Sequence, residues 1–192
     1  MNKEILIICR GGGDLATGIV HRLFRAGYQV LILETAEPAA IRRQVSFCEA
    51  VYEGTATVEG VTAERIYTAK KQAVEEVLQR GRIPLLVDPD GRSIEVLKPD
   101  VVVDAIIAKK NLGTYKEMAP LVIGIGPGFV AGKDVHLVVE SMRGHNLARI
   151  LETGSALANT GIPGNIGLDR SDHRNAESNG QPASTCHGRY GQ

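Results

Sequence analysis

The sequence has no excess of charge of either sign and only three cysteines. Its 192 residues include 22 Lys and Arg against 22 Asp and Glu, so the net charge near pH 7 is zero. Proteins that bind nucleic acid usually carry a basic excess, and this balance argues against that class. The cysteines lie far apart and lack the spacing of metal ligands, which predicts reduced thiols and no metal site.

Long hydrophobic runs are also absent. No apolar stretch approaches the roughly 18 residues that a membrane-spanning helix needs. The first residues lead directly into a short apolar segment, without the pattern of a secretory signal peptide. We therefore expect a cytoplasmic protein that makes no membrane contact.

Short aliphatic runs alternate with helical patterns along the chain, which is typical of βαβ units. Strands are predicted at residues 4–10, 29–34, 83–87, 101–105, 121–125 and 136–140, with one or two more within 55–68. Helices are predicted at residues 14–26, 39–50, 70–80 and 146–152. The order of these segments predicts an α/β fold with a mostly parallel sheet and helices on both faces.

The composition changes after Gly167. Residues 168–192 contain no valine, isoleucine, phenylalanine or methionine and are rich in polar residues. Such a segment buries too little apolar surface to offset the entropy of ordering it. We expect one domain over residues 1–167, followed by a polar, disordered tail over residues 168–192.

A glycine-rich loop follows the first predicted strand and opens the first predicted helix. Residues 11–16 match the pattern G-x-G-x-x-A in this context. In this motif Gly11 allows the tight turn, Gly13 lets the backbone approach a phosphate, and Ala16 allows close helix packing. The free N–H groups and the dipole at the start of the helix favour an anion. The loop therefore predicts a Rossmann-like unit that binds a phosphate-bearing ligand.

Two acidic residues bear on the identity of that ligand. Glu34 ends the second predicted strand, where an acid typically accepts a hydrogen bond from an unphosphorylated ribose, as in NAD. Alternatively, the glycines only form a turn and Glu34 is solvated. Asp14 suits a helix N-terminus but would repel a phosphate. A conventional dinucleotide pose therefore stays open.

Further polar groups follow the later predicted strands. Asp104 ends one strand, and Lys109, Lys110 and Asn111 come shortly after it. A second glycine cluster, at residues 124–129, follows the next strand. The carboxyl ends of parallel strands meet at one edge of the sheet, so we expect these groups near the same crevice. There the lysines neutralise phosphates, or else they belong to a solvated surface.

No complete set of catalytic residues is visible. Residues 140–145 bring Glu, Arg and His together after the last long strand, and His145 is the candidate general base among them. However, spacing assigns it no acidic partner, and the sequence shows no Ser-His-Asp order, Cys-His pair or paired carboxylates. We therefore predict no catalytic residue and favour a binding protein over an enzyme.

Six segments occur in an order that resembles one protein family. They are residues 10–18 (RGGGDLATG), 43–54 (RQVSFCEAVYEG), 104–111, 126–129 (GPGF), 140–145 and 159–164 (NTGIPG). They resemble the YqeB-like proteins of selenium-dependent molybdenum hydroxylase systems, which are related to XdhC-type molybdenum cofactor maturation factors. The resemblance covers residues 4–167. The family's β-rich C-terminal domain has no counterpart in residues 168–192.

The resemblance implies an accessory protein that binds a phosphate-bearing molybdopterin-type cofactor. It would serve the maturation or insertion of this cofactor into an apo molybdenum hydroxylase of the xanthine dehydrogenase type. With the strand-end residues above, the predicted cofactor-binding set is Gly11, Gly12, Gly13, Asp14, Leu15, Ala16, Thr17, Glu34, Asp104, Lys109, Lys110, Asn111, Gly126, Pro127, Gly128, Phe129, Arg143, Gly144 and His145. The alternatives are an NAD-dependent oxidoreductase and a nucleotide-sensing regulatory module. The sequence is also compatible with a homodimer.

Overall fold

The computed structural model describes residues 5–158 of the chain. The predicted domain boundary at residue 167, the tail at 168–192 and the segment at 159–164 lie outside the described residues. No helix in the described range is long and apolar enough to cross a membrane.

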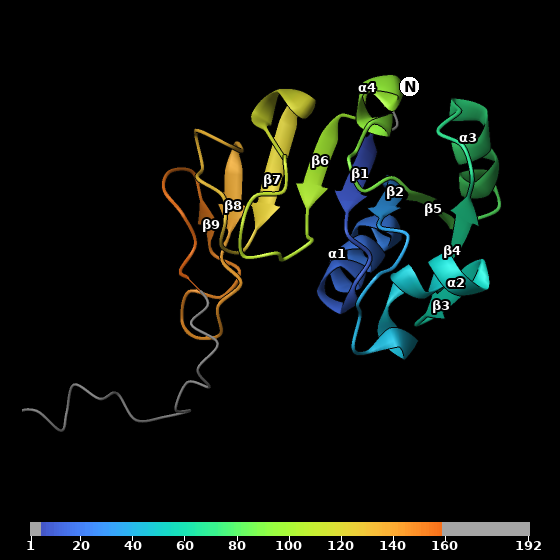
Figure 1. Ribbon diagram of the computed structural model, residues 1–192, viewed down its shortest axis with the longest axis horizontal. Coiled ribbons are helices and arrows are strands. Elements are labelled where there is room, and N and C mark those ends of the chain that lie inside the picture. Colours follow the sequence, from blue (N-terminus) through green and yellow to red (C-terminus); the bar gives the residue numbers. More distant parts are fainter. Residues whose placement is uncertain (1–4, 159–192) are drawn as a thin grey trace, which may run out of the picture. The chain divides into compact units, whose positions relative to one another are not determined.

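The described strands form one sheet in the order β3-β4-β5-β2-β1-β6-β7-β8-β9 (Figure 1). Their bounds are β1 Leu6–Arg10, β2 Gln29–Glu34, β3 Thr55–Val58, β4 Val61–Ile66, β5 Ile83–Val87, β6 Val101–Asp104, β7 Leu121–Ile125, β8 Leu137–Val139 and β9 Ile150–Leu151. All pairs from β4 to β8 are parallel, while β3 and β9 are antiparallel strands at the two edges. The predicted mostly parallel sheet is confirmed.

Helices pack on both faces of this sheet, as predicted. The α-helices are α1 Asp14–Arg25, α2 Ala50–Glu53, α3 Lys71–Gln79 and α4 Ser93–Leu97, with 3-10 turns η1 Arg43–Val45, η2 Phe47–Glu49 and η3 Lys116–Met118. Helices α1 and α2 contribute to the apolar core on one face, and α3 and α4 to the core on the other. We call these the α1 face and the α3 face.

The first prediction to be corrected is the helix at residues 39–50. This segment forms the turns η1 and η2 and only reaches helix α2 at Ala50. Besides short-range bonds within the segment, two of its amides bond to the glycine loop and the start of α1: the Phe47 amide donates to Thr17 Oγ1, and the Cys48 amide to the Gly12 carbonyl. These tertiary bonds replace the bonds of a regular helix.

The predicted helix at residues 146–152 is also wrong. The chain makes a turn at residues 145–148 and then enters the edge strand β9. The Ala148 amide donates to the Glu140 carbonyl, and the Glu140 amide donates to the Arg149 carbonyl. Ile150 then pairs with Val139 of β8. Pairing with the sheet therefore overrides the weak helical pattern.

The strand order reverses direction beside β1. From β1 the chain passes to β2 on one side, and it later returns across the sheet to β6 on the other side. In open α/β sheets, ligands bind at such a switch point, in the crevice outside the carboxyl ends of the strands. The glycine loop follows β1 at this position.

Candidate functional site

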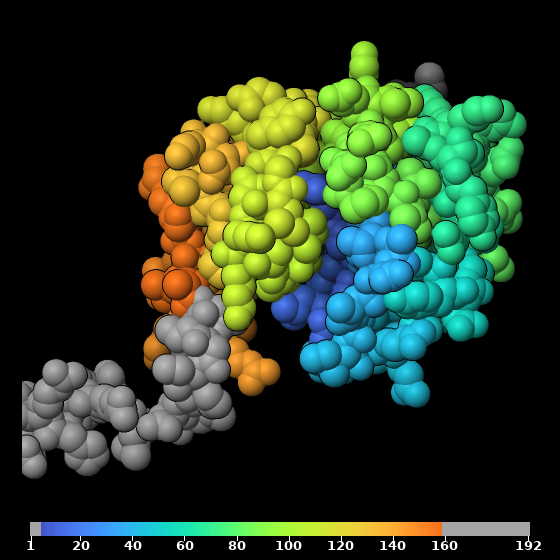
Figure 2. Space-filling view, viewed as in Figure 1, coloured from blue at the N-terminus to red at the C-terminus, as the bar shows by residue number. Residues whose placement is uncertain are grey.

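A crevice of about 510 Å³ opens at the carboxyl ends of β1, β2 and β6. It is lined by the glycine loop and the start of α1, by the segment after β2, by Cys48, and by the segment after β6: Gly11, Gly13, Asp14, Leu15, Ala16, Glu34, Thr35, Glu37, Pro38, Ala39, Ala40, Ile41, Cys48, Ala105, Ile106 and Ile107. In Figure 2 the dark-blue segment that follows the first residues lies at the bottom of a hollow between yellow-green and light-blue segments.

The three glycines of the loop face different surroundings. Gly11 has φ +99°, and a Cβ there would lie 3.0 Å from the Ala105 carbonyl oxygen. A Cβ at Gly12 would lie 3.2 Å from the Cys48 amide nitrogen. Gly13 has an ordinary φ of −66°, and no atom lies within 4 Å of its Cβ position. Gly11 and Gly12 therefore make room for the protein itself, whereas Gly13 borders open space.

The amides of the loop differ in the same way. The Gly11 amide donates to the Leu33 carbonyl at 2.8 Å, and the Gly12 amide donates to Glu34 Oε2 at 2.7 Å. Within the described part of the chain, the Gly13 amide donates to no acceptor. A donor at the start of helix α1 is thus available to an anion in the crevice.

Glu34 holds the loop as well as lining the crevice. Its second carboxylate oxygen accepts a hydrogen bond from the Thr35 amide at 2.8 Å, in addition to the bond from Gly12. A carboxylate has about four lone-pair sites, so two remain for hydroxyl donors of a ligand. The predicted contact of Glu34 with a ribose remains a prediction.

The charge of Asp14 is balanced by a residue that the sequence did not single out. Arg42 Nε donates to Asp14 Oδ2 at 2.8 Å, and this hydrogen bond is the main cause that lowers the pKa of Asp14. Asp14 Oδ1 also accepts from the Leu15 amide at 2.9 Å. The guanidinium therefore offsets the repulsion that Asp14 would exert on a phosphate. Arg42 is 28 residues away and lies in a segment predicted to be a helix, so spacing gave no signal of this pair.

One wall of the crevice is bonded to the glycine loop through Thr17. The Thr17 hydroxyl is buried, donates to the Gly12 carbonyl at 3.1 Å and accepts from the Phe47 amide at 2.9 Å. This places Cys48 at the crevice, where burial, followed by the charge of Glu34, raises the pKa of its thiol to about 11. At neutral pH this thiol is protonated and is a poor nucleophile.

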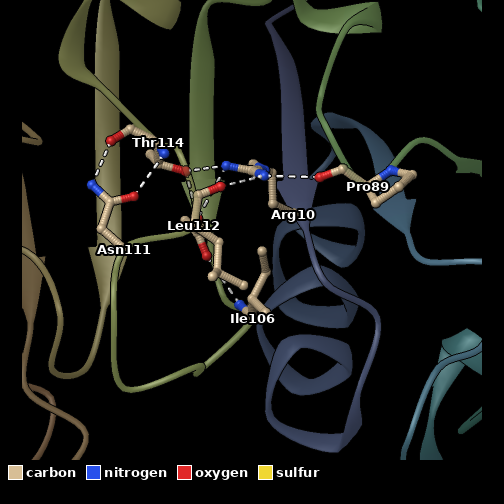
Figure 3. A network of polar contacts seen from close by, with 7 residues as sticks. Arg10, Pro89, Ile106, Asn111, Leu112 and Thr114 are labelled. Carbon is tan, nitrogen blue, oxygen red and sulfur yellow. Dashed lines mark hydrogen bonds and ion pairs between the residues drawn. The ribbon is translucent and has the colours of Figure 1, made fainter.

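A buried polar network holds the wall on the other side (Figure 3). The Arg10 side chain, only 2% exposed, forms an ion pair with Asp104 and donates to the Thr114 hydroxyl. It also donates to the carbonyls of Pro89 at 3.0 Å and Leu112 at 3.2 Å. Arg10 thus ties the end of β1 to the segments that follow β5 and β6. Arg10 was not singled out from the sequence. A charged residue at the end of an apolar strand was nevertheless a sign that its side chain has buried polar partners.

Two predicted ligand-binding residues take part in this network. Asp104 Oδ1 accepts from the Ile106 amide at 3.1 Å, and Oδ2 accepts from the Thr114 hydroxyl. The Asn111 side chain exchanges two hydrogen bonds of 2.7 Å with the backbone of Thr114. The structure therefore uses Asp104 and Asn111 to fix the loop at residues 105–114.

Lys109 and Lys110 lie exposed on that loop, outside the lining of the crevice. Ile107 and Lys109 have φ values of +58° and +61°, a region that branched and bulky residues rarely adopt. The backbone of Lys110 packs against Gly128, where a Cβ would lie 2.8 Å from the Lys110 Cα. The loop is therefore strained at Ile107 and Lys109 and closely packed at Lys110.

Residues 126–129, which were predicted to bind the cofactor, pack within the protein and do not line the crevice. Phe129 is 4% exposed and belongs to the core of the α3 face. Its ring lies over Gly124, where a Cβ would be 2.5 Å from the ring. A Cβ at Gly126 would lie 2.6 Å from Ser141 Oγ, and Pro127 is half-buried.

Residues 143–145, which were also predicted to bind the cofactor, lie away from the crevice. Arg143, Gly144 and His145 are exposed, and none of them lines the crevice. The neighbouring Glu140 is buried, and its carboxylate accepts from the amides of Met142 and Leu157, both at 2.8 Å. Residues 5–158 contain no group of three or more His, Cys, Asp or Glu that could hold a metal ion.

Comparison with known proteins finds a relative in Escherichia coli. A protein of Escherichia coli (strain K12) named "Uncharacterized protein YqeB" is 50% identical over 161 residues, which are 84% of this chain. The chain is YqeB-like. It spans 29% of the length of that relative. No protein-family model and no solved structure matches the chain.

Proposed function

We propose that this YqeB-like chain is a cofactor-binding accessory protein. It holds a phosphate-bearing, molybdopterin-type cofactor in the crevice and serves its maturation or insertion into an apo molybdenum hydroxylase of the xanthine dehydrogenase type. The resemblance of the six sequence segments supplies the cofactor class and the client. The structure supports the part of the proposal that concerns binding.

The observation that carries the proposal is the environment of Gly13. It combines an amide that has no acceptor in the described residues, an open Cβ position and the start of helix α1, all at the switch point of the sheet. A phosphate at this position would accept from the Gly13 amide, and Arg42 already offsets the nearby charge of Asp14. The remaining lining is largely apolar, as in most small-molecule sites.

The lining favours binding over catalysis. Within the described part of the chain it contains no histidine, lysine or tyrosine, and its one thiol is protonated at neutral pH. Of its three carboxylates, those of Asp14 and Glu34 are engaged in hydrogen bonds with the protein, and only the exposed Glu37 has no such bond among the described residues. A protein that holds a cofactor and releases it to a partner needs no general acid or base at the site.

An NAD-dependent oxidoreductase is the second candidate, and a nucleotide-sensing regulatory module is a third. The position of Glu34 favours NAD, because it ends β2 beside the glycine loop with carboxylate lone pairs to spare. A regulatory module would bind NAD without turnover, whereas an oxidoreductase would consume NADH in the presence of a substrate.

Calorimetry with NAD, NADP and molybdenum cofactor, measured side by side, separates these candidates. We expect stoichiometric binding of molybdenum cofactor and, after loading, activation of an apo-hydroxylase in a reconstitution assay. Binding of NAD alone would favour the sensing module. Substrate-dependent oxidation of NADH that Gly13→Val abolishes would favour the oxidoreductase.

A further inference from the structure

The half of the sheet that contains β7, β8 and β9 has an apolar strip on the α1 face. The strip consists of Leu121, Ile123 and Ile125 of β7, Leu137 and Val139 of β8, and Ile150 of β9. The register places these side chains on one face, because Ile123 pairs with Leu137, Ile125 with Val139, and Val139 with Ile150. Ile123 and Ile125 pack at the border of the core that α1 shares.

Within residues 5–158 this strip is only partly covered. The five residues of β7 and β8 remain partly exposed, and Ile150 is 61% exposed. Figure 1 shows no α-helix over β7, β8 and β9. By contrast, the alternate residues Val122 and Val138 are fully buried on the α3 face.

The handedness of the connections explains why no described α-helix lies over this part of the face. Connections between parallel strands are almost always right-handed, so chain that moves in one direction across a sheet places its connections on one face. The steps from β5 to β6, β6 to β7 and β7 to β8 all move in the same direction. Their residues Ile94, Ala119 and Val135 accordingly all pack in the core of the α3 face. A cover for the strip must therefore come from elsewhere.

The sequence of these strands is suited to burial on both faces. Strand β7 reads LVIGI and β8 reads LVV, without the polar alternation of a strand that faces water on one side. Continuous apolar runs of this kind are typical of parallel strands covered on both faces. The strip is thus built to be covered.

The size of the strip favours a single helix over a second copy of this chain. Neighbouring strands lie about 4.8 Å apart, so the strip covers on the order of 250 Å². A stable dimer needs about 800 Å² on each partner. One α-helix, about 10 Å wide, matches the strip. A helix linked to the same polypeptide also avoids most of the entropy cost of association.

We propose that the strip is the docking site of an amphipathic helix that belongs to YqeB-type chains outside the segment matched here. The relative from Escherichia coli extends well beyond this segment, since the chain spans only 29% of it. Residues 168–192 of this chain, which contain no valine, isoleucine, phenylalanine or methionine, have no apolar stripe to supply the helix. The proposal concerns a second surface and is independent of the ligand in the crevice.

The test mixes the full 192-residue chain with the remaining part of the Escherichia coli relative, or co-expresses the two, and measures complex formation by calorimetry and co-purification. We expect a 1:1 complex that Ile123→Lys and Leu137→Lys each weaken at least tenfold. The control Val96→Lys changes an exposed apolar residue of α4, on the opposite face, and should leave affinity unchanged. Thermal melting verifies that each variant is folded.

Three results would overturn the proposal. The first is the absence of a complex in both the mixed and the co-expressed samples. The second is a complex that neither folded lysine variant weakens. The third is a dimer of the chain alone, seen by analytical ultracentrifugation and lost in Ile123→Lys, which would assign the strip to a second copy.

Discussion

The two glycine-rich loops at the carboxyl edge of the sheet are alike in composition but differ in what surrounds them. In the second loop, Gly124, Gly126 and Gly128 each make room for another part of the protein, namely Phe129, Ser141 and Lys110. In the first loop, Gly11 and Gly12 do the same, but Gly13 faces open space. Only the first loop also opens a helix at the switch point of the sheet.

The difference shows that a glycine cluster after a strand does not by itself indicate a ligand site. A glycine is required either where backbone or side chains of the protein come close or where a ligand does. The space around the missing Cβ distinguishes the two cases. By this criterion the second loop is structural and Gly13 marks the proposed ligand site, which single-glycine substitutions can test.

Gly128→Ala should have the largest effect on stability. Gly128 has φ +111°, and a Cβ would lie 2.8 Å from backbone atoms of Lys110, which cannot move independently of the loop. We expect a loss of roughly 2–5 kcal/mol from the left-handed backbone and the overlap together. Urea denaturation measures this loss. A change below about 0.5 kcal/mol would mean that the two loops do not pack as described.

Gly124→Ala should be the next most damaging substitution. Its backbone conformation is ordinary, so the cost arises only because the new methyl group overlaps the buried Phe129 ring. We expect a loss of about 1–3 kcal/mol. The double variant Gly124→Ala with Phe129→Leu should lose less than the sum of the two single changes, which a double-mutant cycle detects. Simple additivity would contradict the contact.

Gly11→Ala tests whether the first loop contains a structural glycine as well. Gly11 has φ +99°, and its Cβ would meet the Ala105 carbonyl oxygen at 3.0 Å. The left-handed conformation costs an alanine about 1–2 kcal/mol. The same denaturation assay applies, and an unchanged midpoint would show that the turn is more tolerant than its geometry indicates.

Gly13→Val should have the smallest effect on stability. The site has φ −66° and an open Cβ position, so only the weaker preference of valine for a helix N-cap counts, about 1 kcal/mol or less. A loss as large as that of Gly128→Ala would remove the distinction between the loops.

Much of the fold could be predicted from the sequence because its strands are short, apolar and punctuated by glycine. The bounds of β2, β5 and β7 match the predicted residues, and the predicted helix at 14–26 differs from α1 by one residue. The predicted helix at residues 39–50 was wrong because two amides of this segment bond to Gly12 and Thr17, a tertiary arrangement that periodicity cannot show.

The site was harder to predict than the fold. The residues near Gly13 and Glu34 could be found because motif, strand end and helix start coincide. Asp104, Asn111 and Phe129 share the sheet edge but serve buried contacts, which sequence position alone cannot distinguish from ligand contacts. Arg42 was missed because its pairing with Asp14 depends on the path of the intervening chain.

The most direct test of the central claim compares Gly13→Val with Gly18→Val by calorimetry against molybdenum cofactor. Gly18 lies five residues further along, in α1, and also has no atom within 4 Å of its Cβ position, but it does not line the crevice. We predict that both variants stay folded, that Gly18→Val binds as the unchanged chain does, and that Gly13→Val loses at least tenfold in affinity. Equal affinity of the folded Gly13→Val variant and the unchanged chain would contradict the assignment of the site.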